Sequence, residues 1–167
     1  MNNNISMGKF ADSWEGNGRK TKNITLCVTE DCNLCCKYCY MVGKNKKKKM
    51  TFDMAKKCVD YFLNNRELFD EEAVVWEFIG GEPLLEMDLI DKICDYIKIQ
   101  MYIKKHPWFE AYRFSFSTNG ILYGTKKVQG YLEKNKNHVS MGISIDGNKK
   151  NMINKEYILM EKDHMMM

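Results

Sequence analysis

Four of the chain's seven cysteines lie within eight positions, in the segment CNLCCKYC at residues 32–39. Clustered thiols in a chain with no apparent secretory signal indicate metal binding or catalysis more often than disulfides. A structural zinc site usually takes its ligand pairs from separate segments, and the adjacent Cys35 and Cys36 would force four ligands into one cramped loop. The bacterial ferredoxin pattern C-x2-C-x2-C-x3-C-P differs as well. The spacing therefore favours a metal centre held by only some of these thiols.

Cys32, Cys36 and Cys39 form the pattern C-x3-C-x2-C. Three thiolates can hold three irons of a [4Fe-4S] cluster and leave the fourth iron without a protein ligand. An open coordination position is what a catalytic metal needs and what a structural site lacks. We therefore predict these three cysteines as ligands and Cys35 as a bystander. The other thiols, at positions 27, 58 and 94, fall in strand or helix patterns and are predicted to lie in the core.

Strand and helix patterns alternate along the rest of the chain. Short apolar runs predict four strands, and apolar residues at helical spacing predict three helices between them. The predicted strands cover residues 23–29, 73–79, 113–118 and 139–146, and the predicted helices begin near residues 51–53, 88 and 125. This order predicts an α/β fold whose parallel strands are joined by right-handed crossovers.

Two of the predicted strands have one apolar face and one small, polar face. In the third strand, Phe114 and Phe116 alternate with Ser115 and Ser117, and the fourth strand repeats the alternation over residues 139–146. A strand covered by helices on both faces would be apolar throughout. The polar face therefore predicts a cavity, as expected for an open barrel around a cofactor.

Each predicted strand ends in a chemically distinctive segment. These segments are the cysteine loop, GGEP at residues 80–83, STNG at residues 117–120 and Asp-Gly at residues 146–147. In parallel α/β folds, ligands bind at the carboxyl ends of the strands. We therefore expect the four segments to meet at one site.

These motifs resemble those of the radical S-adenosylmethionine (SAM) superfamily. The resemblance rests on C-x3-C-x2-C after the first strand, on Tyr38 before its last cysteine, and on GGEP, STNG and SIDG at the next three strand ends, and it covers roughly residues 23–150. The segments VTEDCNLCCKYCY and WEFIGGEPLLE are similar to those of members that modify ribosomally made peptides and of anaerobic sulfatase maturases. The resemblance implies a partial (β/α) barrel of parallel strands, with about four of the family's six strands present.

The resemblance also implies two cofactors, a [4Fe-4S] cluster and SAM. The implied cluster ligands are Cys32, Cys36 and Cys39. The residues implied to bind SAM are Tyr38, Gly80, Gly81, Glu82, Pro83, Ser117, Asn119 and Ser144. In this scheme Tyr38 stacks on the adenine, the two glycines let the backbone approach the methionine part, and the polar residues bond its charged groups or the ribose. No catalytic residue is assigned.

The implied reaction is reductive cleavage of SAM to a 5′-deoxyadenosyl radical, which abstracts hydrogen from a peptide. The implied partners are a precursor peptide or protein substrate and a low-potential electron donor of the flavodoxin or ferredoxin kind. A second hypothesis stays open, namely that the chain is a non-catalytic iron-sulfur-binding fragment, or a degenerate remnant, of such an enzyme. A His-Asp pair and an arginine that the family pattern leads us to expect after the fourth strand are absent from the sequence.

The chain is expected to comprise a flexible leader at residues 1–22, a partial core domain at 23–150 and an atypical, methionine-rich tail at 151–167 that looks truncated or frameshifted. Residues 41–57 carry seven lysines and one aspartate. We interpret them as a solvated loop, because no aromatic residues interleave with the lysines as in a nucleic-acid groove. No apolar window of about 20 residues predicts a membrane span, and the N-terminal residues lack the apolar run of a secretory signal. The predicted location is the cytoplasm.

Overall fold

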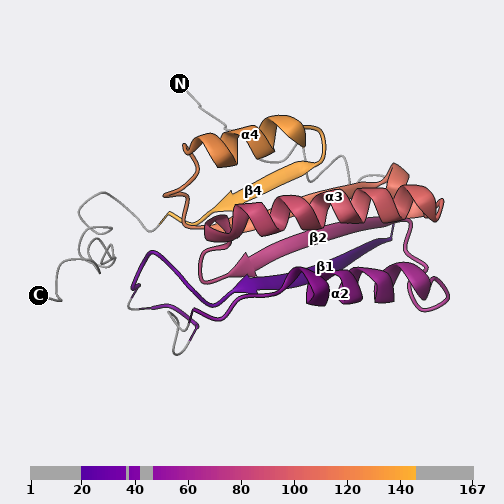
Figure 1. The fold of residues 1–167 in the computed structure, drawn as a ribbon, viewed down its shortest axis with the longest axis horizontal. Coiled ribbons are helices and arrows are strands. Elements are labelled where there is room, and N and C mark those ends of the chain that lie inside the picture. Colours follow the sequence, from indigo (N-terminus) through magenta and orange to yellow (C-terminus); the bar gives the residue numbers. More distant parts are fainter. Residues whose placement is uncertain (1–19, 37, 42–46, 146–167) are drawn as a thin grey trace, which may run out of the picture.

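The computed structural model describes residues 20–36, 38–41 and 47–145. Within these ranges, four parallel strands form one sheet in chain order. The strands are β1 (Thr21–Thr29), β2 (Ala73–Gly80), β3 (Tyr112–Thr118) and β4 (Val139–Ile143). Figure 1 labels β1, β2 and β4 of this sheet. The α/β fold of parallel strands predicted from the sequence is confirmed.

In the described part of the chain, three α-helices lie along the sheet and connect its strands (Figure 1). They are α2 (Phe52–Asn64), α3 (Met87–Ile103) and α4 (Lys126–Lys134). Thr51 caps α2, because its hydroxyl accepts a hydrogen bond of 3.2 Å from the Met54 amide. The sequence did not predict two short 3-10 helices, η1 (Pro83–Glu86) and η2 (Pro107–Glu110). No helix in the described ranges combines the length and apolar character that a membrane span requires.

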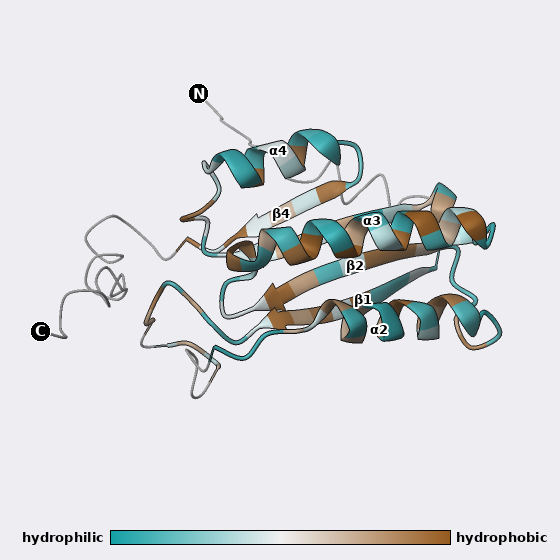
Figure 2. Cartoon of the chain, in the orientation of Figure 1, coloured by the Kyte–Doolittle hydropathy of each residue, from teal (hydrophilic) through white to brown (hydrophobic). Residues whose placement is uncertain are grey.

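The core lies between the helices and one face of the sheet. Ile24, Trp76 and Phe114 are neighbours in register across β1, β2 and β3, and all three are buried. The helix residues that pack against this face include Ala55, Val59, Leu63, Ile90, Ile93, Ile97, Met101 and Val128. In Figure 2, β2 is hydrophobic over most of its length, whereas the visible surface of α4 is largely hydrophilic. The helical spacing of the apolar residues therefore accounts for how the helices cover this face.

The opposite face of the sheet is polar and partly open. Thr25, Glu77, Ser115 and Ser140 lie side by side across the four strands. The Thr25 hydroxyl donates a hydrogen bond of 2.8 Å to the Glu77 carboxylate, and Ser117 is exposed one step further along β3. The small, polar face that the sequence predicted for β3 therefore continues across the sheet.

The three thiols predicted to lie in the core have different outcomes. Cys94 is buried, and Cys58 is partly buried against the core cluster. The prediction for Cys27 is wrong, because this residue alternates with the buried Leu26 and Val28 and is exposed on the polar face. A strand residue's face depends on its register, which an isolated cysteine does not reveal.

The strand ends differ slightly from the predicted ranges. β1 begins two residues earlier than expected, because Thr21 and Lys22 pair with Ala73 and Val74. β4 ends at Ile143, and the Ser144 amide then donates a hydrogen bond of 2.9 Å to the Thr118 carbonyl. The predicted Asp-Gly turn at 146–147, most of the leader and the tail lie outside the described residues.

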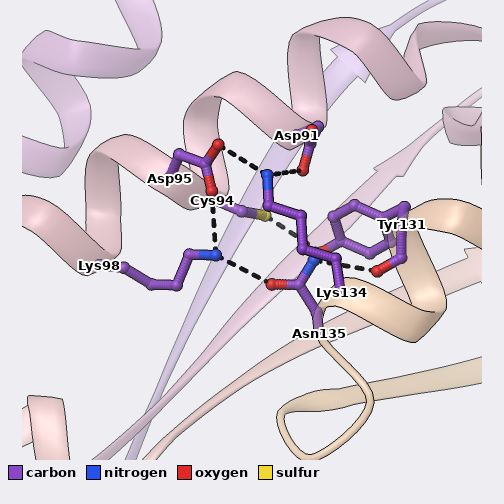
Figure 3. A network of polar contacts seen from close by, with 7 residues as sticks. All are labelled: Asp91, Cys94, Asp95, Lys98, Tyr131, Lys134 and Asn135. Carbon is purple, nitrogen blue, oxygen red and sulfur yellow. Dashed lines mark hydrogen bonds and ion pairs between the residues drawn. The ribbon is translucent and has the colours of Figure 1, made fainter.

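A network of polar contacts joins α3 to α4 on the outer side of the core (Figure 3). Lys134 contacts Asp91 at 2.8 Å and Asp95 at 2.7 Å. Beneath these ion pairs, the Cys94 thiol and the Tyr131 hydroxyl are 3.1 Å apart, and burial raises the pKa of the Cys94 thiol well above its usual value. Cys94 is therefore held as a neutral thiol that stabilises helix packing and is unsuited to bind a metal.

His106 gives the fold a predicted dependence on pH. Burial, together with the nearby Arg66 and Lys104, lowers the pKa of its imidazole to about 4. In the unfolded chain the pKa of this imidazole is about 6.5. Between pH 6.5 and 4 the unfolded chain therefore binds a proton at His106 that the folded chain does not bind. The free energy of unfolding should therefore fall as the pH drops through this window, by up to about 3 kcal/mol.

The matched variant is His106→Asn, because asparagine retains the acceptor that caps η2 through the Trp108 amide. Urea unfolding of the parent and the variant at several pH values from 4 to 7 measures the effect. The variant should lose less stability than the parent over this range. Identical pH slopes for the two chains would show that His106 does not titrate as its surroundings indicate.

Candidate functional site

A cleft of about 370 Å³ lies at the carboxyl ends of the strands. The residues lining it come from the cysteine loop and from the ends of β2, β3 and β4. They are Cys32, Leu34, Cys36, Tyr38, Cys39, Tyr40, Ile79, Gly80, Gly81, Ser117, Thr118, Asn119 and Ser144. The structure therefore brings all three predicted cluster ligands and six of the eight predicted SAM-binding residues to one cleft, whereas Cys35 does not line it.

The cysteine loop is braced where it leaves and rejoins the sheet. After the loop, the chain returns antiparallel to the end of β1, where the Met50 amide bonds the Val28 carbonyl at 2.9 Å and the Glu30 amide bonds the Lys48 carbonyl at 2.9 Å. Within the loop, the buried Leu34 donates its amide to the Cys32 sulfur at 3.4 Å. This contact places an N–H group on the sulfur of a predicted ligand.

The donor set fits an iron-sulfur cluster. All seven cysteines lie in the described ranges, and none of them forms a disulfide. In the described part of the chain, no group of three or more His, Cys, Asp or Glu side chains forms a site for a single metal ion. A cluster places its irons at separate corners and so needs three thiolates around one cavity, which is how Cys32, Cys36 and Cys39 are arranged. Two of the predicted ligands, Cys36 and Cys39, are half-buried, and the Cys39 amide donates a hydrogen bond of 3.2 Å to the Cys36 carbonyl.

Gly80 and Gly81 lie directly against the backbone that follows β1. The Gly81 amide donates to the Thr29 carbonyl at 2.9 Å, and the Glu82 amide donates to the Asp31 carbonyl at 2.8 Å. A Cβ atom on either glycine would lie 2.2 Å from a backbone oxygen, that of Thr29 for Gly80 and that of Asp31 for Gly81. Sequence reasoning assigned the space at these glycines to the cofactor. The structure shows that the close approach is to the start of the cysteine loop.

Glu82 is fully buried, and its side chain does not line the cleft. One carboxylate oxygen accepts hydrogen bonds from the Thr118 hydroxyl at 2.6 Å and the Leu84 amide at 3.0 Å, and the other accepts from the Asn119 amide at 2.9 Å. Pro83 is likewise buried and begins η1. In this structure, then, Glu82 joins the end of β2 to the end of β3 and supports the cleft from behind.

Two tyrosines from the cysteine loop line the cleft. Tyr38, predicted to stack on an adenine, is 55% exposed, and Tyr40, which sequence reasoning missed, is 77% exposed. Partial burial raises the pKa of the Tyr40 phenol, and the neighbouring Cys27, Cys39 and Glu77 add to this effect. The sequence feature that could have identified Tyr40 as a lining residue is its position directly after Cys39, the last cysteine of the motif. Leu34 and Ile79 were also missed as lining residues, whereas Thr118 belongs to the STNG segment expected at the site.

Glu82→Gln should lower the free energy of unfolding by about 1–3 kcal/mol. Both carboxylate oxygens accept hydrogen bonds, so the amide nitrogen of glutamine must face a donor and leave it buried without an acceptor. Chemical denaturation of the chain measures the change. The control is Glu133→Gln, which removes an exposed ion pair with Lys136 and should have little measurable effect. Equal stability of the two variants would contradict a supporting role for Glu82.

Comparison with known sequences gives three relatives that resemble the chain only over part of their length. "Uncharacterized protein MJ0907" of Methanocaldococcus jannaschii is 38% identical over 136 residues, which are 81% of this chain and 42% of that protein. "Radical SAM cyclopropyl synthase TigE" of Paramaledivibacter caminithermalis is 27% identical, over 70% of this chain and 26% of that protein. "Serine-type anaerobic sulfatase-maturating enzyme" of Bacteroides thetaiotaomicron is 28% identical, over 70% of this chain and 27% of that protein. The chain thus spans less than half the length of each relative.

Solved structures show the same fold. "Native anSMEcpe with bound AdoMet" superposes with a TM-score of 0.67 at 22% identity, and covers 83% of this chain and 36% of that one. "Native anSMEcpe with bound AdoMet and Kp18Cys peptide" superposes with a TM-score of 0.66 at 21% identity over the same shares. At this level of identity the likeness concerns the arrangement of strands and helices.

The family model described as "Radical SAM superfamily" matches the part of the chain that forms the cleft and its strands. It matches residues 26–158, so it includes the cysteine loop, both glycines and the ends of β2, β3 and β4. The match covers well over half of the chain and agrees with the motifs that the structure gathers at one edge of the sheet. The chain therefore belongs to the radical SAM superfamily.

Proposed function

We propose that this chain binds a [4Fe-4S] cluster through Cys32, Cys36 and Cys39, cleaves SAM reductively, and uses the resulting radical to modify a peptide. The observation that carries the proposal is the shared cleft, in which three thiols from one loop face the backbone of Gly80 and Gly81 and the polar ends of β3 and β4. Reductive cleavage of SAM is general to the superfamily, whereas the cluster type and the peptide substrate are part of the proposal.

The residues of the cleft have distinct roles in this proposal. Cys32, Cys36 and Cys39 would hold the cluster, which when reduced would supply the one electron needed for reductive cleavage of a carbon–sulfur bond of SAM. The backbone at Gly80 and Gly81 and the polar groups of Ser117, Asn119 and Ser144 orient the methionine part and the ribose. Tyr38 offers an aromatic surface for the adenine.

The peptide substrate is proposed from the names of the relatives. One relative is named as a cyclopropyl synthase and another as a sulfatase-maturating enzyme, and one solved neighbour holds both AdoMet and a peptide. The radical would abstract hydrogen from the peptide, and a low-potential flavodoxin- or ferredoxin-like protein would reduce the cluster. The polar face of the sheet, which carries Thr25, Glu77 and Ser115, borders the same cleft and is the surface that such a substrate would meet.

A second candidate function is cluster binding without peptide modification. It is favoured by the openness of the polar face, where Thr25, Cys27 and Ser117 are exposed, because a primary radical needs protection from water. In this case the chain would bind the cluster and SAM and release 5′-deoxyadenosine without modifying a peptide.

The test is anaerobic reconstitution with iron and sulfide, followed by reduction in the presence of SAM and a candidate precursor peptide. The proposed function predicts bound iron and sulfide, formation of 5′-deoxyadenosine and a peptide mass change that reports hydrogen loss. Formation of 5′-deoxyadenosine with an unchanged peptide would select the second candidate. A chain that binds no iron under these conditions would rule out both.

A further inference from the structure

The Asn119 side chain links the end of β3 to the cysteine loop. Its amide nitrogen donates a hydrogen bond of 2.8 Å to the side-chain oxygen of Asn33, and it lies 4.0 Å from the Cys32 sulfur. Asn33 is half-buried, and Cys32 is buried beside it. One side-chain amide group, directly after β3, therefore contacts both the first predicted cluster ligand and its immediate neighbour.

The orientation of this amide is fixed by the turn in which it lies. The Asn119 side-chain oxygen accepts a hydrogen bond of 3.0 Å from the Ile121 amide, and a backbone N–H can only donate. The nitrogen of the Asn119 amide must therefore face the cysteine loop. This places two N–H bonds on the side where Asn33 and Cys32 lie.

Behind this contact, Asn119 is attached to the buried carboxylate of Glu82. Glu82 accepts from the Asn119 backbone amide at 2.9 Å and from the Thr118 hydroxyl at 2.6 Å, and that hydroxyl in turn accepts from the Gly120 amide at 3.0 Å. The turn that carries Asn119 is thus held by the end of β2. A continuous set of hydrogen bonds runs from the interior, through Glu82 and Asn119, to the cysteine loop.

We infer that Asn119 is a positioning residue for the cluster loop, which it holds through Asn33 and next to the Cys32 sulfur. Outer-shell hydrogen bonds of this kind hold metal ligands in place. The inference rests on the proposed cluster binding and adds a role for Asn119 that is separate from contact with SAM. It also gives Asn33, a residue outside the family motif, a specific role.

Two variants at Asn33 test the contact without disturbing the β3 turn. Asn33→Asp retains the oxygen that accepts from Asn119, whereas Asn33→Ala removes it. A third chain combines Asn33→Asp with Asn119→Asp, so that oxygen faces oxygen while the bond from the Ile121 amide remains. Thermal unfolding of the metal-free chains verifies that all three fold as the parent does.

The first readout is the rate at which a chelator removes iron from the reconstituted chain. Asn33→Ala and the double variant should lose iron about tenfold faster than the parent, the usual scale for an outer-shell contact, and Asn33→Asp should stay close to the parent. The second readout is alkylation of Cys32 in the metal-free chain, measured by mass spectrometry. Asn33→Ala and the double variant should expose this buried thiol and react several-fold faster, and Asn33→Asp should react no faster than the parent.

Equal rates for Asn33→Ala and Asn33→Asp in both readouts would overturn the inference, since the acceptor oxygen would then be irrelevant. So would a double variant that behaves like Asn33→Asp alone. A parent chain that binds no iron would refute the proposed function. The alkylation experiment needs no cluster, so it would still test whether Asn119 holds the cysteine loop.

Discussion

Replacing Cys32, Cys36 and Cys39 together by alanine should reduce bound iron and sulfide after reconstitution to almost nothing. These thiols line one cleft, and they are the residues that the C-x3-C-x2-C pattern selects. Thiolate ligation is what holds such clusters, so a chain without the three sulfurs offers no comparable donors around the cavity. Iron and sulfide analysis, with the visible absorption of the cluster, measures the loss. The parent should hold about four irons and four sulfides per chain.

The matched control is Cys35→Ala. Cys35 is adjacent to Cys36 in sequence but does not line the cleft, so its removal should leave the iron content unchanged. Stoichiometric zinc in place of iron after anaerobic purification would contradict the assignment. Loss of the cluster in Cys35→Ala alone would contradict it equally, because it would move the ligand set to a different trio of thiols.

Gly81→Ala should destabilise the chain by about 3 kcal/mol or more and displace the cysteine loop. The new Cβ would lie 2.2 Å from the Asp31 carbonyl oxygen and 2.9 Å from that of Glu30, and both atoms belong to the backbone, which cannot rotate away as a side chain does. Relief of the clash must lengthen the hydrogen bonds that Gly81 and Glu82 donate to Thr29 and Asp31. Reconstituted iron should therefore fall together with the free energy of unfolding.

Gly130→Ala is the matched control for this substitution. Gly130 lies in α4, and nothing lies within 4 Å of a Cβ added to it, so alanine there should stabilise the chain by about 0.5–1 kcal/mol. Urea unfolding and iron analysis on both variants decide the point. A Gly81→Ala chain with parental stability and iron content would show that this turn does not fix the cysteine loop.

The sequence predicted the four parallel strands and the edge of the sheet at which the motifs meet. Alternation in β3 predicted its polar face, because successive side chains of a strand point to opposite sides. The same rule would have placed Cys27 on that face, had the buried Leu26 and Val28 on either side of it been weighed. Periodicity could therefore determine the fold and the edge, because both depend on patterns that extend over many residues.

The partners of individual motif residues could not be predicted in the same way. The resemblance to the family assigned Glu82 and Asn119 to the cofactor, yet the Glu82 carboxylate accepts hydrogen bonds from Thr118 and Asn119, and the Asn119 side-chain amide contacts the cysteine loop. Which groups a polar side chain bonds depends on contacts between segments distant in sequence, such as Glu82 and Thr118. Likewise, nothing in the GGEP motif indicates that the backbone after β1 lies against its glycines.

The order of the strands in the sheet, β1 to β4, has a consequence for how the chain is made. Each strand pairs only with an edge formed earlier, so the sheet can assemble while the chain leaves the ribosome. The cleft, however, needs Ser144, which is synthesised 112 positions after Cys32. Because a ribosome adds roughly 5–20 residues per second, Ser144 is made on the order of ten seconds after Cys32. We therefore expect the chain to bind the proposed cluster only after β4 has joined the sheet.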